Sequence, residues 1–226
     1  MTMTAVPDSG VELAHAGSVE PVLVPRPPQR TRIEAAPRPV DLVAAEQAGR
    51  LFLKALGIDP DAPNAPDLAR TPRRFAEAYA ELLAPEPFDF TTFANTEGYD
   101  ELVLIRDIPV HSVCEHHLLP FTGVAHVAYL PGDSVVGLSK IPRMVDHYAR
   151  RPQTQERLTV QIADALAVRL QPRGIGVVIE ATHTCMTLRG ARAVGTATTT
   201  SALRGALRDD PRSRAEFFAL TTDRTR

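Results

Sequence analysis

Two short segments gather both cysteines of the chain and four of its seven histidines. They read His111-Ser-Val-Cys114-Glu-His116-His117 and His183-Thr-Cys185. Thiolate and imidazole are common zinc ligands, and a catalytic zinc site takes three protein ligands and leaves a fourth position for water. Cys114 and His117, three residues apart, can converge on one ion from a turn, and Cys185 can complete the set from a distant strand. The two segments therefore predict a hydrolytic zinc centre.

Two further histidines, His116 and His183, lie beside the predicted ligands without being needed as ligands. Because a histidine titrates near neutral pH, both are suited to moving protons around a water molecule activated by zinc. The alternative is that each cysteine is a small buried hydrophobe and each histidine a structural residue. We assign that structural role to His15, His126 and His147, which lie outside the two segments.

A cationic cluster is expected where Gly137-Leu-Ser139-Lys140-Ile-Pro-Arg143 runs from a strand end into a helix. Backbone N–H groups, a hydroxyl and two cationic side chains could bind phosphate there, and Arg189 could add a third charge. A solvated basic helix start is the alternative. The formal net charge of −2 and the pI near 6.4 argue against general nucleic-acid binding, so an anionic ligand must be met by a local cluster.

A glutamate stands in the first turn of the longest predicted helix, within Gln153-Thr-Gln155-Glu156-Arg157. Such a residue normally interacts favourably with the helix dipole or acts as a capping partner. The carboxylate of Glu156 could instead accept two hydrogen bonds, from the amine and the ring N–H of guanine. The sequence pattern alone leaves both roles open.

Short helices and strands must position these residues. Helical spacing and capping signals predict helices from the N-cap Asp41 to Gly57, from the N-cap Thr71 to Leu83, around Pro142, over 154–170, and over 211–220 after Asp210. Short β-branched runs predict strands at 101–110, 124–130, 135–138, 176–181 and 191–201. Helices before, within and after a largely antiparallel sheet indicate an α+β domain.

The overall composition suits one globular domain with a tail. The chain has 226 residues, of which 44% are hydrophobic, and its proline-rich first 38 residues show no periodicity, which predicts a disordered tail. No apolar run approaches the roughly 20 residues that a membrane span needs, and Asp8 and Glu12 do not suit a secretory signal. We therefore expect a cytoplasmic protein whose two cysteines are thiols or thiolates.

Four motifs in order make the chain resemble GTP cyclohydrolase I. They are Cys114-Glu-His-His-Leu-Leu-Pro-Phe, Gly137-Leu-Ser-Lys-Ile with Arg143, Gln153-Thr-Gln-Glu-Arg-Leu158, and Glu180-Ala-Thr-His-Thr-Cys-Met-Thr-Leu-Arg-Gly190. The resemblance runs from about residue 40 to the C-terminus. It implies a tail over 1–38 and a catalytic domain over 39–226, with N-terminal helices at 40–84 and a core at 100–226.

The resemblance also implies roles residue by residue. The positions that match zinc ligands are Cys114, His117 and Cys185, and those that match proton-transferring residues are His116 and His183. The positions that match guanine recognition are Gln155 and Glu156, and those that match contacts to the triphosphate and ribose are Ser139, Lys140, Arg143, Arg189 and Arg74. Ser139 is also expected to assist the later rearrangement of the ribose. Glu77 departs from the lysine of some members, and its carboxylate would repel a triphosphate next to Arg74.

For the whole protein, the resemblance implies the conversion of GTP to 7,8-dihydroneopterin triphosphate and formate, the first step of tetrahydrofolate and pterin biosynthesis. Water activated by zinc would attack C8 of the purine. The implied fold is the tunnelling fold, an antiparallel sheet with helices on one face that forms an oligomeric barrel. The implied assembly is a decamer of two pentamers with active sites at subunit boundaries.

Two rival functions remain open from the sequence. One is a nitrile reductase of the same fold that acts on a deazaguanine, although it uses a cysteine as nucleophile and would not need the zinc trio or the cations. The other is a purine-nucleotide-binding regulatory oligomer without catalysis. It fits less well because every matching catalytic position is occupied.

Overall fold

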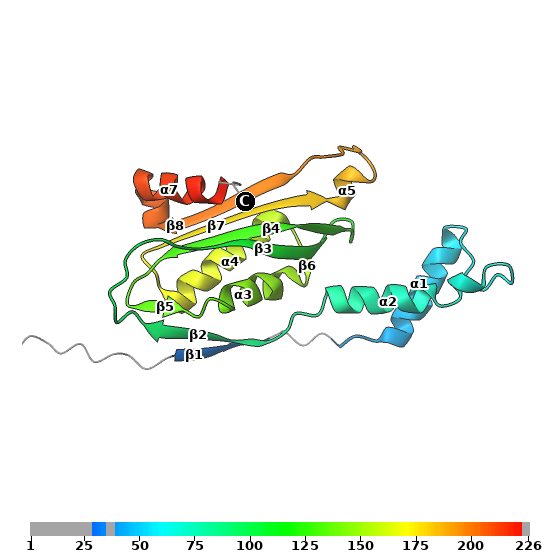
Figure 1. Cartoon of the computed structure of the whole chain (residues 1–226). Helices are drawn as coiled ribbons and strands as arrows, with labels where there is room; N and C mark the ends of the chain where they lie inside the picture. Colours follow the sequence, from blue (N-terminus) through cyan, green and yellow to red (C-terminus); the bar gives the residue numbers. More distant parts are fainter. Residues whose placement is uncertain (1–28, 35–38, 223–226) are drawn as a thin grey trace, which may run out of the picture.

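A mixed five-stranded sheet forms the centre of the computed structural model, which describes residues 29–34 and 39–222 (Figure 1). The strand order is β6 (Pro152–Gln153), β3 (Val103–Cys114), β4 (Pro120–Leu130), β7 (Gly174–His183) and β8 (Thr198–Gly205). All neighbours are antiparallel except the short β6, which pairs parallel to β3. The α+β class is thus confirmed, whereas the sheet is mixed rather than purely antiparallel.

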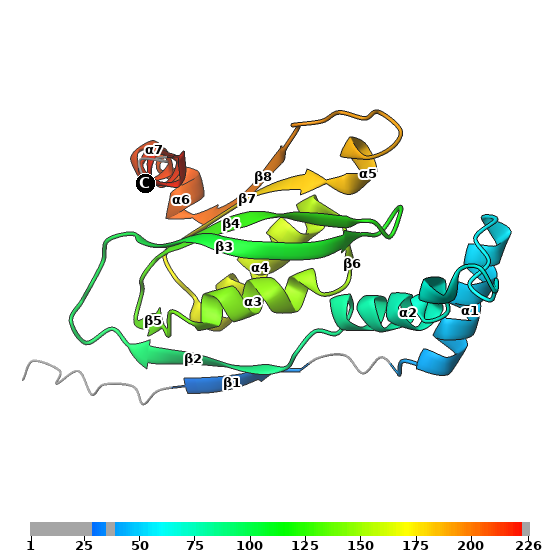
Figure 2. The ribbon, with the colours of Figure 1, turned by 45° about the vertical axis from the view of Figure 1, so that its right-hand side comes forward.

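Helices cover both faces of this sheet (Figure 2). One face carries α3 (Lys140–Ala149) and α4 (Gln155–Leu170), and the other carries α6 (Ala206–Asp209) and α7 (Pro211–Thr222). The expectation of helices on one face is therefore wrong. The physical reason is a second apolar patch around Ala128 and Val178, which Phe217 of α7 covers. Gly176 permits this contact, because a Cβ there would lie 2.7 Å from the Phe217 ring.

Alternation along β7 decides which residues can reach which face. Val177 and Ile179 pack in the main core under α4, while Val178 between them packs with Phe217 on the face of α7. His183, at the end of the strand, has the same parity as Val177 and Ile179. It therefore lies on the α4 side, and Glu180 lies on the α7 side.

A second, three-stranded sheet lies across α3 and α4 from the main sheet (Figure 2). It consists of β1 (Gln29–Ile33), β2 (Phe88–Ala94) and β5 (Ser134–Val136) in that order, and both pairings are antiparallel. Residues 29–33 were expected in the disordered tail, but they form β1 because β2 offers a pairing edge and Ile33 is buried. The remainder of the predicted tail, apart from Glu34, lies outside the described residues.

An N-terminal helical hairpin stands away from the sheet body (Figure 2). It comprises α1 (Leu42–Ala55), the short 3-10 helix η1 (Pro66–Leu68) and α2 (Thr71–Leu82). The predicted N-cap Asp41 accepts a hydrogen bond from the Ala44 amide at 2.9 Å. Thr71 is the first helical residue rather than the N-cap, because Arg70 occupies that position without a side-chain hydrogen bond.

The other sequence-predicted elements are present with shifted ends. β3 extends to Cys114, and α4 begins after the N-cap Thr154, whose side chain accepts from the Arg157 amide. The strand expected over 191–201 begins only at Thr198, and β2, β6, α6 and the short helix α5 (Thr184–Thr187) were not predicted. None of the helices in the described ranges combines the length and apolar character that crossing a membrane requires.

Candidate functional site

The ends of β3 and β7 bring both cysteines to one place. Cys114 is the last residue of β3, and β4 pairs with both β3 and β7, so that Phe121 opposes His183 across the β4–β7 ladder. The chain then enters α5, which carries Cys185. The two sulfur atoms lie 4.0 Å apart, although the residues are separated by 71 positions.

A tight turn after Cys114 carries the two neighbouring histidines. The Leu118 amide donates to the Cys114 carbonyl at 2.8 Å, and the Cys114 amide donates to the Leu119 carbonyl at 2.9 Å. Leu118 takes the left-handed conformation, with φ of 53°, to close this turn. As a result, Nδ1 of His117 lies 3.8 Å and Nδ1 of His116 lies 3.9 Å from the Cys114 sulfur. Both histidines of the turn therefore lie near the Cys114 sulfur, and the role of His117 as a metal ligand stays a prediction.

These separations fit a zinc ion. With Zn–S near 2.3 Å and Zn–N near 2.05 Å, tetrahedral geometry places two sulfur ligands roughly 3.8 Å apart and a sulfur and a nitrogen roughly 3.6 Å apart. In addition, one ligand atom each from Cys114, His183 and Cys185 lies within 4.8 Å of the others. The histidine that the structure groups with both thiols is therefore His183, whereas the predicted ligand His117 lies close to Cys114.

Burial and charge set the protonation of this group. Burial raises the pKa of the Cys185 thiol, and the neighbouring Cys114 raises it further, whereas Arg189 lowers it. The Cys185 thiol therefore holds its proton near neutral pH without a cation, and binding of a metal to its thiolate must release that proton. Burial lowers the pKa of His183, and the carboxylate of Glu156 opposes this effect. His183 is accordingly neutral near pH 7 and able to accept a proton.

The first turn of α4 lies against the metal segments. Arg157 donates to the Glu115 carboxylate in the turn, to the Pro152 carbonyl, and through Nε to Gln153 at 2.8 Å. Within the described residues, the exposed Glu156 carboxylate forms no hydrogen bond or ion pair. Glu156 directly follows Gln155, whose side chain contacts His183 at 2.8 Å, and its carboxylate raises the pKa of that ring. A guanine base could therefore be read by Glu156 beside the metal segments.

Gln155 is placed differently from its predicted role. The resemblance implies that Gln155 helps to recognise guanine, and its side chain is 2% exposed and bonded within the protein. Any contact of Gln155 with a base would come from its backbone N–H, which is a free donor position at a helix N-terminus.

The predicted phosphate cluster is remote from the metal segments within one chain. Ser139 and Lys140 begin α3, and Arg143 follows one turn later. The other end of α3 lies next to the Cys114 end of β3, because the Ser112 hydroxyl donates to the Ala149 carbonyl at 2.7 Å. A helix of ten residues is about 15 Å long, so the cluster begins roughly that far from the end of β3.

The remaining predicted cations lie elsewhere. Arg189 is near Cys185, since its charge acts on that thiol. Arg74 is exposed on α2. Glu77, which was expected to repel a triphosphate, is paired with Arg73 through a 2.8 Å contact between Nε and Oε1. Near its C-terminal end, α2 contacts the turn that follows Cys114, where the Tyr79 hydroxyl donates to the Leu118 carbonyl.

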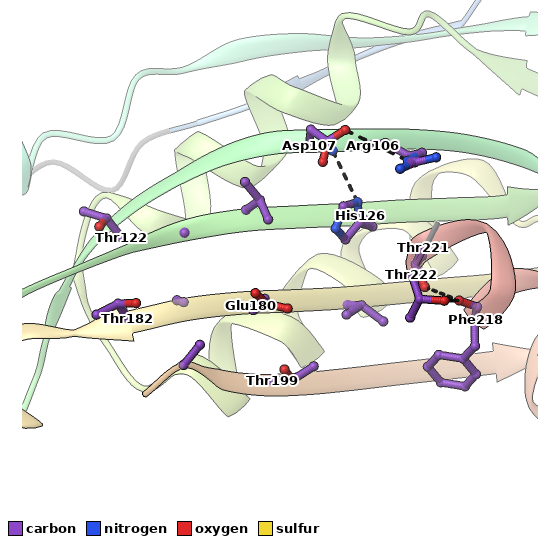
Figure 3. Close-up of a pocket in the computed structure, with 15 residues that line it drawn as sticks. Arg106, Asp107, Thr122, His126, Glu180, Thr182, Thr199, Phe218, Thr221 and Thr222 are labelled. Atoms are coloured by element: carbon purple, nitrogen blue, oxygen red, sulfur yellow. Dashed lines mark hydrogen bonds and ion pairs between the residues drawn. The ribbon is translucent and has the colours of Figure 1, made fainter. Parts of the chain in front are cut away.

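A cavity of about 1040 Å³ lies on the opposite face of the sheet, beside α7 (Figure 3). Threonine side chains such as Thr122, Thr182 and Thr199 line it, together with Glu180 and His126. None of the predicted site residues is part of its lining. His126 is buried and its Nδ1 accepts from the Asp107 amide, which agrees with its assignment as a structural residue.

Comparisons with known proteins point to one family. The profile of "GTP cyclohydrolase I" matches residues 45–222. "GTP cyclohydrolase 1" of Rhodopirellula baltica is 52% identical over 184 residues, which is 80% of this chain and 79% of that protein. The proteins of the same name from Mycobacteroides abscessus and Mycobacterium tuberculosis H37Rv are 55% and 54% identical, over 80% and 81% of this chain and 89% and 92% of theirs. Among solved structures, the apo form of the archaeosine synthase QueF-Like aligns with a TM-score of 0.39 and 21% identity, over 46% of this chain and 93% of that chain.

Proposed function

The chain belongs to the GTP cyclohydrolase I family, and on that premise we propose that Cys114, His117 and Cys185 hold a zinc ion in its active site. The enzyme is a hydrolase that converts GTP to 7,8-dihydroneopterin triphosphate and formate, the first step of tetrahydrofolate and pterin biosynthesis. The observation that carries the proposed centre is the 4.0 Å approach of the two cysteine sulfurs, with Nδ1 of His117 at 3.8 Å from Cys114. When bound, zinc supplies the Lewis acidity that lets a water molecule act as a nucleophile near neutral pH.

The protein's own groups then move protons and hold the base. His183, neutral because of its burial, accepts a proton as water adds at C8 of the purine. His116, which is exposed on the turn, donates protons to the ring nitrogens as the C8–N bonds break. C8 leaves as formate, so that one water is consumed overall after the ribose carbons close the new ring. Ser139 assists the rearrangement of the ribose.

The remaining contacts orient the nucleotide. Glu156 accepts two hydrogen bonds from the guanine edge, and the positive charges of Lys140, Arg143, Arg189 and Arg74 hold the triphosphate. Glu77 does not oppose Arg74, because Arg73 neutralises its carboxylate.

The active site is shared between subunits of an oligomeric barrel, a decamer of two pentamers. Two observations support this proposal. The Lys140 end of α3 lies about 15 Å, one helix length, from the end of β3 that carries Cys114. Large apolar side chains are also exposed within three of the four motifs: Leu118 at 47%, Leu138 at 63% and Leu188 at 75%. Such exposure favours burial against a second copy.

A subunit-mixing experiment tests the shared site. Cys185→Ser and Lys140→Ala are each expected to be inactive alone. Random co-assembly at equal amounts restores about a quarter of the sites if Cys185 and Lys140 come from different subunits. Each site then has about a one-half chance of an intact Cys185 and about a one-half chance of an intact Lys140 from the neighbouring subunit. The matched control mixes Cys185→Ser with Cys114→Ser, two changes in the same half-site, and recovers nothing. Absence of recovery in the first mixture would show that each site lies within one chain.

The reaction itself is tested with GTP labelled with ¹³C at C8. The zinc-replete protein is expected to release labelled formate while dihydropterin absorbance grows, and chelator-treated protein is expected to release none. The assay also separates the rival activities, since neither a nitrile reductase nor a purine-binding regulator excises C8. Labelled GTP that remains intact in the presence of metal-replete protein would reject the proposed activity.

We also place the enzyme in the cytoplasm. Both cysteines of the chain are free thiols, and the proposed zinc centre needs them reduced, which suits a reducing compartment.

A further inference from the structure

Gln155 lies inside the protein, and its side-chain amide lies within hydrogen-bond distance of four groups. Its Nε2 lies 3.0 Å from the Ile179 carbonyl, 2.8 Å from the Thr198 carbonyl and 3.1 Å from the Thr200 hydroxyl. Its Oε1 lies 2.8 Å from Nε2 of His183. The amide thus joins β7 and β8 to the imidazole beside the two thiols.

The partners of this amide fix its orientation. Backbone carbonyls can only accept hydrogen bonds, so the NH₂ group must face Ile179 and Thr198. The opposite orientation would set Oε1 against two carbonyl oxygens. Oε1 therefore faces His183, and because a carbonyl oxygen cannot donate, the hydrogen of this contact belongs to Nε2 of the imidazole.

Two hydroxyl groups complete a consistent network. The Thr159 hydroxyl donates its single hydrogen to the backbone carbonyl of Gln155 at 2.7 Å. The Thr200 hydroxyl, 2.7 Å away, must then donate to Thr159, which leaves its lone pairs to accept from the Gln155 amide. Every donor has an acceptor in this arrangement, and the direction of each hydrogen bond follows from the carbonyl groups.

We propose that Gln155 is a positioning residue that holds His183 with its hydrogen on Nε2, so that Nδ1 is the basic nitrogen used in proton transfer. The Phe121 ring stacks on the imidazole, with centroids 4.4 Å apart and planes at 12°, and fixes the plane of the ring. Gln155 then decides which edge of the ring faces the site. The catalytic part rests on the proposed function, whereas the ring tautomer does not.

The tautomer is measured directly. The full-length assembly, labelled with ¹⁵N in its histidine rings, is examined by solid-state NMR, and the His183 signals are assigned by their loss in His183→Ala. Wild-type His183 is expected to show a protonated Nε2 and an unprotonated Nδ1. Gln155→Met keeps the length of the side chain but removes all four bonds. It is expected to populate the other tautomer and to lower kcat about 10- to 100-fold, with KM for GTP little changed.

Gln153→Met is the matched control. Gln153 is also fully buried, two residues away, and its amide bonds to Tyr148 and Gln161 rather than to His183. Its loss should leave the ring signals of His183 unchanged. A wild-type His183 protonated on Nδ1 would overturn the inference, and so would identical ring signals in Gln155→Met and wild type.

Other outcomes separate the positioning role of Gln155 from the proposed function of the enzyme. A raised KM with unchanged kcat in Gln155→Met would show instead that the side chain reads guanine, and this would also overturn the inference. The wild-type measurement decides the tautomer even if the variant does not assemble. The expected tautomer in a protein that releases no formate would support the role of Gln155 in holding the ring and would reject only the proposed function.

Discussion

Cys185→Ser is expected to purify without zinc and to release no formate from GTP. The Cys185 sulfur lies 4.0 Å from that of Cys114, and a serine oxygen at the same place is a much poorer zinc ligand. Removing a group that only hydrogen-bonds to a metal ligand lowers metal affinity by up to roughly 100-fold. The loss of zinc affinity in Cys185→Ser should be larger, because a ligand itself is replaced. Metal content is measured by mass spectrometry of the dialysed protein, together with formate release.

The two candidate histidines provide the control for this experiment. His117→Ala is expected to lose zinc as Cys185→Ser does. His183→Ala is expected to keep zinc and to lose about 10²- to 10⁴-fold in rate, the contribution of a general acid or base. Equal zinc loss in His183→Ala and Cys185→Ser would contradict this division and assign the third ligand position to His183, which lies within 4.8 Å of both sulfurs.

Glu156→Ala is expected to weaken GTP binding by about 10- to 150-fold, because a hydrogen bond to a charged group contributes roughly 1.5–3 kcal/mol. The carboxylate is exposed, so the free energy of unfolding should fall only by the roughly 0.3–1 kcal/mol of a helix-dipole interaction. Discrimination between GTP and inosine triphosphate should fall as well, since the inosine base lacks the amine that Glu156 accepts from.

Glu101→Ala serves as the comparison, because Glu101 is an exposed acidic residue outside the site. It should change neither the affinity for GTP nor the preference over inosine triphosphate. A large loss of stability in Glu156→Ala with unchanged affinity would mean that Glu156 only supports the start of α4.

The approach of His117 to Cys114 could be predicted from the sequence. Cys114 and His117 converge because three residues of spacing form one turn, and local geometry of this kind is readable from spacing. The proposal that Cys185 belongs to the site followed from its chemical type and its neighbouring His183. Its exact approach depended on β4 pairing with both β3 and β7, which is a tertiary choice that no local pattern encodes.

The role of Gln155 shows where sequence interpretation stops. Its position next to Glu156 at a helix start suggested a ligand contact, yet its side chain is buried because β7 and β8 present two carbonyls and the Thr200 hydroxyl to it. Similarly, β1 lacks a strand signal of its own and forms through its pairing with β2. Both depend on partners that are distant in the sequence.

Zinc titration of the metal-free protein tests the central claim most directly. Formate release from GTP should be absent without metal and should rise in proportion to added zinc until about one ion per chain is bound, because each chain supplies one three-ligand centre. Two results would contradict the assignment of Cys114, His117 and Cys185 as the hydrolytic centre. One is formate release that is independent of zinc, and the other is a protein that is saturated with zinc but releases no formate.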